Sequence, residues 1–170
     1  MTYKVIDNFL DKSEFKQISN LILDNEEGFE WFFSDGVTHV KAESEIWSTY
    51  FVHVFYISSV PNSRHFQFLN QIFAPKLDKE NSLRSWLRIK ANLYPNTETI
   101  KEHTKHSDYD FSHKAAIFSL NTCDGFTRMS DGTKVDSVAN RLILFDAHDE
   151  HNSSTTSDSK YRANINFNWL

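Results

Sequence analysis

The amino-acid sequence predicts a mainly β protein, built as a double-sheet jelly roll with helices packed on its outside. Two helix-like segments come early in the chain, and many strand-like segments surround and follow them. Aromatic residues make up 15% of the 170 residues, whereas only 4 residues are glycine. This balance favours strands over a glycine-rich nucleotide-binding fold, and neither the G-x-G-x-x-G motif nor a Walker loop is present.

The first half of the chain is expected to contribute strands and both helices. Its predicted strands are rich in aromatic and β-branched residues and cover residues 3–9, 29–33 and 46–57. A helix capped by Asp11 or Ser13 is expected to run to about residue 24. Residues 64–77 carry apolar side chains at helical spacing, and Pro75 should bend or shorten the end of this second helix.

The second half of the chain is expected to be strands joined by turns. The predicted strands cover residues 83–94, 113–120, 141–145 and 161–169, and Asp131-Gly132 is a hairpin signal. In the first of these strands apolar and polar residues alternate, so its polar side chains share one face: Arg88, Lys90, Asn92 and Tyr94. A polar face of this kind is either solvated surface or the lining of a barrel.

Composition and charge exclude several classes of protein. The net charge is −5 and no cluster of lysine and arginine stands out, which disfavours tight binding to nucleic acid. A local basic groove that binds nucleic acid is the alternative. Cys123 is the only cysteine, so we expect a small packed residue, no internal disulfide and a reducing compartment. The chain lacks a signal-peptide pattern and a run of about 18 apolar residues, so we expect a cytoplasmic protein without a membrane span.

A His-x-Asp motif is the most informative feature of the sequence. His106 and Asp108 are two residues apart, and such residues point the same way on a strand. A third ligand, His151, would complete a set of two imidazoles and one carboxylate, which non-haem Fe(II) oxygenases use with open positions opposite. Arg162 follows eleven residues after His151 and could hold the far carboxylate of a dicarboxylic co-substrate.

Other histidines compete for these roles. His103 lacks an x-Asp partner, and His148 fits the spacing to Phe145 and Arg162 less well than His151 does. A surface loop with no metal is the alternative for the His-x-Asp motif itself.

The last predicted strand has an unusual polar face. Its alternation places four polar residues together, namely Arg162, Asn164, Asn166 and Asn168, opposite an apolar set that reads as core. The polar set predicts either a pocket lining or a solvated edge strand.

The ordered set of His-x-Asp, distal His and Arg resembles the Fe(II)/2-oxoglutarate-dependent oxygenases of the compact prolyl-hydroxylase-like kind. The resemblance covers roughly residues 88–170. It implies a distorted double-stranded β-helix (jelly-roll or cupin-like) core, with Fe(II), 2-oxoglutarate as co-substrate, O₂, and ascorbate as an accessory reductant. Small members encoded by bacteriophages share this pattern, which is compatible with a phage-encoded protein that acts in the host cytoplasm.

The resemblance also assigns roles to residues outside the metal set. It implies that Arg162 binds the 5-carboxylate of 2-oxoglutarate, and that Asn92, Tyr94 and Asn164 contact the same molecule. The alternative for Asn92 and Tyr94 is ordinary hydrogen bonding at the end of a strand. Thr127 matches an Asn…Gly-Gly-x-Thr segment of these relatives, apart from one missing glycine, and counts here as fold evidence and not as a site.

The resemblance implies hydroxylation of a C–H bond, with release of succinate and CO₂, on a prolyl residue of a peptide or protein or on a small molecule. A nucleobase-demethylating oxygenase is the first alternative, suggested by Asn92-x-Tyr94 and Arg162-x-Asn164 and disfavoured by the charge. The second alternative is a non-catalytic jelly-roll binding module. We expect one domain over residues 1–170, with N-terminal strands and supporting helices in 1–80 and the metal-bearing core in 83–170. The oligomeric state is not readable from the sequence.

Overall fold

A large antiparallel sheet forms the main layer of the protein, as seen in a computed structural model that describes residues 3–24, 28–36 and 46–170. Its strands follow the order β1-β9-β6-β11-β5-β3-β2, and β4 pairs with β3. They are β1 (Lys4–Ile6), β2 (Phe32–Ser34), β3 (Tyr50–Ile57), β4 (Val60–Pro61), β5 (Trp86–Pro95), β6 (Lys114–Ser119), β9 (Leu142–Asp146) and β11 (Tyr161–Trp169).

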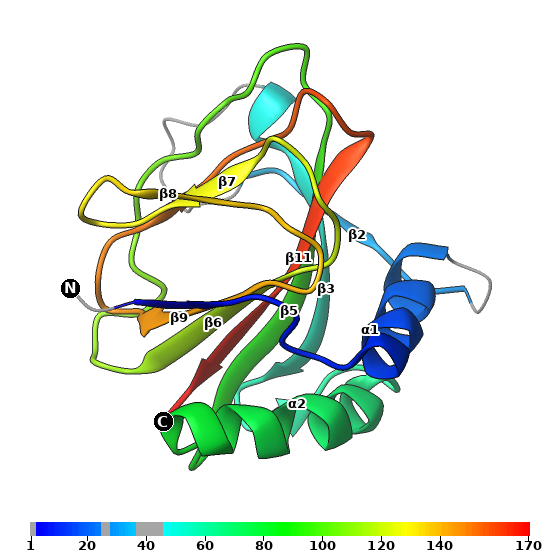
Figure 1. Cartoon of the computed structure of the whole chain (residues 1–170), viewed down its shortest axis with the longest axis vertical. Helices are drawn as coiled ribbons and strands as arrows, with labels where there is room; N and C mark the ends of the chain where they lie inside the picture. The colour runs from blue at the N-terminus through cyan, green and yellow to red at the C-terminus, as the bar shows by residue number, and fades with distance from the viewer. Residues whose placement is uncertain (1–2, 25–27, 37–45) are drawn as a thin grey trace.

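A small sheet lies opposite the large one and completes the jelly roll (Figure 1). Its order is β10-β7-β8, from strands β7 (Phe126–Arg128), β8 (Lys134–Asp136) and β10 (Asn152–Ser153). Two isolated bridges, Glu102 with Ser154 and His106 with His151, add the segment after β5 to this layer. The mainly β fold with a jelly-roll core and flanking helices is therefore confirmed.

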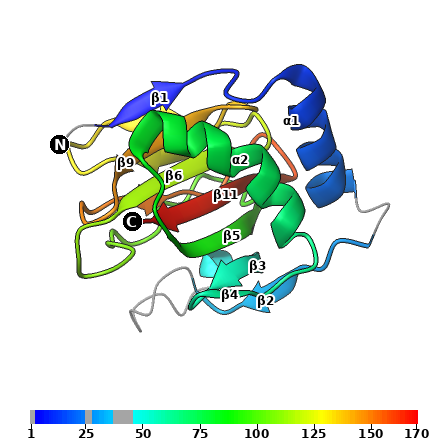
Figure 2. The same cartoon turned by 90° about the horizontal axis from the view of Figure 1, so that it is seen from below.

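Both helices cover the outer face of the large sheet, and Figure 2 shows α2 lying across it. Helix α1 (Lys12–Ser19) continues as a π-helical turn (Asn20–Asp24), and Asp11 caps its start in a reciprocal capping box with Glu14. Helix α2 (Phe66–Asn81) contributes Leu69, Phe73 and Leu77 to the core, all fully buried. None of the described helices is long and apolar enough to cross a membrane.

The two helices differ from expectation at one position. Pro75 was expected to bend or shorten the end of the second helix, and the shortening is wrong, because α2 continues to Asn81. Pro75 removes one backbone donor, yet Phe73 and Leu77 on either side of it are buried against the sheet. Packing on both sides of the proline therefore outweighs the missing hydrogen bond.

Several predicted strands are shorter or shifted. The strand expected over residues 3–9 ends at Ile6, because Asn8 adopts a positive φ of 52°. The strand expected over 29–33 occupies Phe32–Ser34, since the ring of Phe29 packs 4.3 Å from that of His53 instead of extending the ladder. The strand expected over 46–57 begins at Tyr50, after a 3₁₀ turn (Ile46–Ser48).

Strands β5 and β11 divide the molecule into an apolar and a polar side. They pair antiparallel along their length, with Tyr94 opposite Arg162 and Lys90 opposite Asn166. The apolar residues of both strands join the core beneath the helices. The polar residues face the small sheet, so the polar face of each strand lines the interior of the jelly roll and is not a solvated edge.

Candidate functional site

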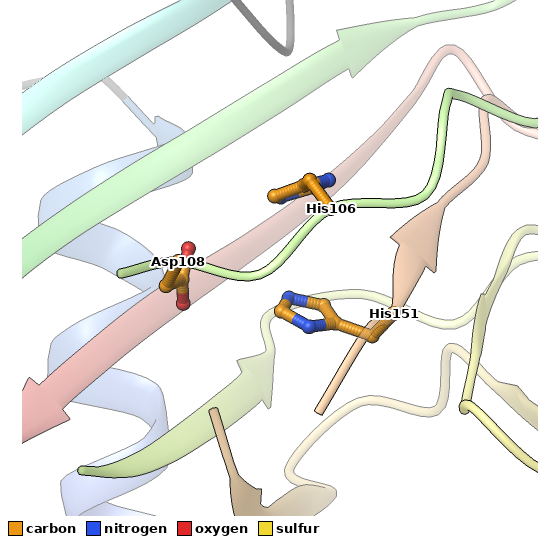
Figure 3. Close-up of side chains that lie close together, drawn as sticks. All are labelled: His106, Asp108 and His151. Atoms are coloured by element: carbon orange, nitrogen blue, oxygen red, sulfur yellow. The ribbon is translucent and has the colours of Figure 1, made fainter. Parts of the chain in front are cut away.

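His106, Asp108 and His151 meet between the two sheets. One ligand atom from each of the three side chains lies within 4.8 Å of the other two. Figure 3 shows the three side chains close together, two from the segment after β5 and one from the residue immediately before β10. The backbones of His106 and His151 hold each other by two hydrogen bonds of 3.0 Å, which fixes the distance between their rings.

Backbone contacts of both imidazoles favour the tautomer that leaves Nε2 free for a metal. His106 Nδ1 lies 3.1 Å from the carbonyl oxygen of Thr104, and His151 Nδ1 lies 3.2 Å from that of Asp149. A carbonyl can only accept, so each Nδ1 carries the proton. The lone pair of each ring is then on Nε2, where it is available to a metal ion.

Three neighbours hold the carboxylate of Asp108. Arg88 Nη2 donates to Oδ1 at 2.7 Å, and the side-chain amides of Asn168 and Asn166 lie 2.8 and 3.4 Å from Oδ2. Burial opposes ionisation of Asp108, but the guanidinium of Arg88 and the side-chain amide of Asn168 outweigh it and hold the pKa well below its usual range. Burial also lowers the pKa of His151, which keeps this imidazole neutral.

The three side chains open into a cavity between the sheets, whose empty space measures about 390 Å³ when the open solvent at its mouth is included. Its lining is mostly polar and comes from both layers: Lys90, Asn92, Tyr94, His106, Asp108, Ile117, Thr127, His151, Ser153, Asn164 and Asn166.

Arg162 is a buried cation behind this cavity. It is 1% exposed, and no carboxylate pairs with it among the described residues. Its Nη2 donates to Thr127 Oγ1 at 2.8 Å and its Nη1 to the carbonyl of Ser154 at 3.1 Å, while Nε has no partner. A buried guanidinium without a counter-anion is costly, so this arrangement favours an anionic ligand.

Asn92, Tyr94 and Asn164 line the path between Arg162 and the three clustered side chains. Asn92 Nδ2 donates to Asn164 Oδ1 at 2.9 Å, and both residues are buried. The ring of Tyr94 stacks on that of Tyr50 at 5.5 Å. Burial raises the pKa of Tyr94 to about 12, so its hydroxyl stays protonated and can donate to an acceptor.

The seven residues singled out from the sequence therefore surround one cavity, although Arg162 approaches it through Thr127 and does not line it directly. His103 and His148 stay outside the cluster. His148 is exposed, and His103 is buried against the ring of Tyr94 at 5.1 Å.

Sequence reasoning missed three residues at this site. Thr127 was read as fold evidence alone, yet it binds Arg162 and lines the cavity. Arg88 and Lys90 belonged to the polar face of the predicted strand without a role. The alternation of β5 carried the signal, because it placed both cations on the face shared with Asn92 and Tyr94.

Comparison with known proteins supports the architecture. The sequence matches no protein-family model and no curated protein sequence. Its structure is similar to an oxidoreductase of the 2-oxoglutarate-Fe(II) oxygenase family from Burkholderia pseudomallei, with a TM-score of 0.70, 12% identity, and coverage of 98% of this chain and 84% of that one.

Two prolyl hydroxylase structures are also similar. A prolyl-4-hydroxylase from Pseudomonas putida gives a TM-score of 0.66 at 16% identity, covering 98% of this chain and 91% of that one. The 2-oxoglutarate complex of a viral collagen prolyl hydroxylase from Paramecium bursaria Chlorella virus-1 gives 0.62 at 13% identity, covering 99% and 95%. The chain thus has the fold of 2-oxoglutarate-Fe(II) oxygenase structures, with a double-stranded β-helix core.

Proposed function

We propose that this protein is an Fe(II)- and 2-oxoglutarate-dependent oxygenase that hydroxylates a C–H bond and releases succinate and CO₂. The observation that carries the proposal is the convergence of His106, Asp108 and His151 beside a cavity backed by the unpaired guanidinium of Arg162. The first three offer a metal-ligand set, and the fourth offers the counter-charge for a carboxylate.

The donor set fits Fe(II). The Nε2 atoms of His106 and His151 and a carboxylate oxygen of Asp108 would hold the ion, and three protein ligands leave positions for further ligands. Arg88 and Asn168 hold the carboxylate of Asp108 in place before a metal arrives. This support from outside the ligand set orients the ligand at little entropic cost.

The polar residues between the metal-ligand set and Arg162 also fit 2-oxoglutarate. Arg162 and the hydroxyl of Thr127 would take its distal carboxylate, while Tyr94, Asn92 and Asn164 would contact its length. Two buried atoms there have no partner, Arg162 Nε and Asn92 Oδ1, which indicates that the site is incomplete without a ligand. When bound, Fe(II) and 2-oxoglutarate supply oxidative decarboxylation by O₂ coupled to C–H oxidation.

The protein's own residues keep the reaction in register. An ionic contact at Arg162 fixes one end of the co-substrate, so its other end meets the three ligands in one orientation. We propose that residues 1–170 act as one domain, since β1 near the N-terminus pairs with β9 of the metal-bearing half.

A prolyl substrate is the finer part of the proposal. The similarity to the Pseudomonas putida prolyl-4-hydroxylase supports it. A prolyl hydroxylase from Trichoplax adhaerens, in complex with a peptide fragment, is similar as well, with a TM-score of 0.66 at 14% identity. We propose a prolyl residue of a peptide or protein, or a related small molecule, as the substrate.

The test is succinate formation. The protein is loaded anaerobically with Fe(II) and 2-oxoglutarate, O₂ is admitted with prolyl peptides or with methylated oligonucleotides, and succinate is measured. His106→Ala should abolish succinate formation, whereas the exposed loop variant His148→Ala should retain it. Equal succinate from wild type and His106→Ala would contradict the proposal and favour a non-catalytic binding module. Gain of one oxygen on proline or loss of a methyl group from a base then decides the substrate class.

A further inference from the structure

Lys90 brings an unpaired ammonium to the cavity. The residue lies on the inward face of β5 and lines the cavity beside Asp108. No hydrogen bond or ion pair of Lys90 occurs among the described residues. Its Nζ lies over the ring of Tyr50, 5.7 Å from the ring centroid. Lys90 interacts electrostatically with Asp108 but forms no ion pair with it, and the proposed co-substrate contacts do not use this cation.

The charges that face the interior do not balance. Three cations lie there, namely Arg88, Lys90 and Arg162, against the single carboxylate of Asp108 among the described residues at the cavity. Arg88 already pairs with Asp108 at 2.7 Å. The distal carboxylate of 2-oxoglutarate would satisfy Arg162, and Asp108 is already paired with Arg88, so Lys90 is left without an ion-pair partner of its own.

Strand register separates Lys90 from the co-substrate end of the cavity. Lys90 lies opposite Asn166, whose amide reaches toward Asp108 at 3.4 Å, so it is level with the metal ligands. Tyr94, opposite Arg162, is four residues further along β5, a separation of about 13 Å. The co-substrate would extend from the metal ligands toward Arg162, whereas Lys90 stays at the metal end, where the reacting carbon must come.

We propose that Lys90 is a specificity-determining residue and that the substrate carries an anionic group, a carboxylate or a phosphate, which pairs with its ammonium. The inference rests on the proposed oxygenase function and deepens it by naming the charge of the substrate. Burial lowers the pKa of Lys90 to about 8, so the side chain remains mostly cationic at neutral pH. An anion at this position would form a desolvated, charge-assisted contact close to the reaction centre.

The direct test uses Mn(II) as a paramagnetic replacement for Fe(II). Wild type, Lys90→Met and Lys90→Arg are loaded with Mn(II) and 2-oxoglutarate, and the nuclear relaxation of added acetate and inorganic phosphate is measured. Wild type and Lys90→Arg should enhance the relaxation of at least one anion, and Lys90→Met should lose most of this enhancement, by about fivefold or more. Stronger relaxation enhancement of acetate would indicate carboxylate recognition, and stronger enhancement of phosphate would indicate phosphate recognition. Equal enhancement in wild type and Lys90→Met would overturn the proposal.

Two further measurements separate this inference from other roles of Lys90. The Kd of 2-oxoglutarate should change by less than about twofold in Lys90→Met, and a loss of about tenfold or more would reassign Lys90 to the co-substrate. The melting temperature of Lys90→Met should equal or exceed that of wild type, because a half-buried ammonium without an ion pair does not stabilise the fold. A melting temperature several degrees lower would show a structural role and overturn the proposal.

Failure of the oxygenase proposal is visible separately. If wild type binds neither Mn(II) nor 2-oxoglutarate, the metal site itself is wrong. The metal-free protein is therefore titrated in parallel with acetate and with phosphate. The backbone amide NMR shift of residue 90 and that of Asn166 are followed in wild type and in Lys90→Met. Shifts in wild type that vanish in Lys90→Met support the anion site without any metal, and no shift in wild type contradicts it.

Discussion

At the residue scale, Arg162 is the side chain on which co-substrate binding should depend most. Replacement by Met keeps much of the apolar stem and removes the guanidinium that lacks a carboxylate partner. The affinity for 2-oxoglutarate should fall by about 10- to 100-fold, the range expected for hydrogen bonds to a charged group. Isothermal titration of the Mn(II)-loaded protein with 2-oxoglutarate measures this change.

A matched arginine elsewhere provides the control for Arg162. Arg141 pairs with Asp7 at 2.6 Å, on the surface and away from the cavity. Arg141→Met should leave 2-oxoglutarate affinity unchanged, and both variants should retain Mn(II) affinity, because neither removes a metal ligand. Unchanged 2-oxoglutarate affinity in Arg162→Met would show that the co-substrate carboxylate binds elsewhere.

Lys90 gives the stability of the protein a defined pH dependence. Burial lowers its pKa from 10.5 to about 8, so the unfolded state binds more protons between these two pH values. The contribution of Lys90 to the free energy of unfolding therefore rises with pH through this window, and below about pH 8 the cost of burying the charge is present in full. In urea unfolding, Lys90→Met should have a larger free energy of unfolding than wild type at about pH 7, and this difference should shrink by about pH 9.5. A difference in the free energy of unfolding that grows with pH would contradict the lowered pKa of Lys90.

Sequence spacing predicted that His106, Asp108, His151 and Arg162 would lie around one site. The expected strand under the His-x-Asp motif was wrong, because His106 and Asp108 lie in the irregular segment between β5 and β6, where the backbone pairing of His106 with His151 brings the motif into the site. The ion pair between Arg88 and Asp108 was not predictable in the same way. It joins two segments whose relative placement depends on the turn between them, and no periodic pattern describes that turn.

At the element scale, the alternation of β5 and β11 was predictable and their partners were not. The predicted strand over residues 161–169 has the same bounds as β11, because its nine residues alternate between polar and apolar without interruption. The short strands β4 and β10, of two residues each, left no such pattern. Phe29 misled the prediction because an aromatic residue fits both a strand and a core, and tertiary packing decides between them.

The turn that enters β7 should be sensitive to any added side chain. A Cβ at Gly125 would lie 2.6 Å from the carbonyl oxygen of Thr155 and 2.7 Å from Cδ of Arg162. Gly125→Ala should therefore destabilise the fold by about 1–3 kcal/mol and also weaken 2-oxoglutarate binding, since Arg162 must shift. Urea unfolding and isothermal titration measure the two effects.

Gly132, in the turn between β7 and β8, separates these two effects. Its φ is +88° and a Cβ there would meet nothing within 4 Å. Gly132→Ala should cost about 1–2 kcal/mol through backbone strain and leave 2-oxoglutarate affinity intact. If both glycine variants bind 2-oxoglutarate like wild type, the turn before β7 does not position Arg162.

At the scale of the whole molecule, the site exists because distant segments close on one another. β11, from the C-terminal end of the chain, lies between β5 and β6 in the large sheet, while the segment after β5 crosses to the small sheet to pair with His151. The sequence predicted the class of fold, but register and sheet order depend on contacts far apart along the chain. Ligands that bridge the two sheets should therefore act on the stability of the entire fold.

Binding of metal and co-substrate should raise the melting temperature of the whole protein. His106 and Asp108 precede β6, His151 precedes β10 and Arg162 lies on β11, so the bound pair would tie both sheets together only in the folded state. At ligand concentrations near 100 Kd, linkage stabilises the native state by about 2.7 kcal/mol, or roughly 5–10 °C for a chain of this size. Differential scanning calorimetry with Mn(II) and 2-oxoglutarate measures the shift, and a chelator should reverse it. His151→Ala should lose the shift whereas His148→Ala retains it, because only the former removes a ligand from the cluster. A shift of equal size in both variants would mean that the ions stabilise the protein at some other place.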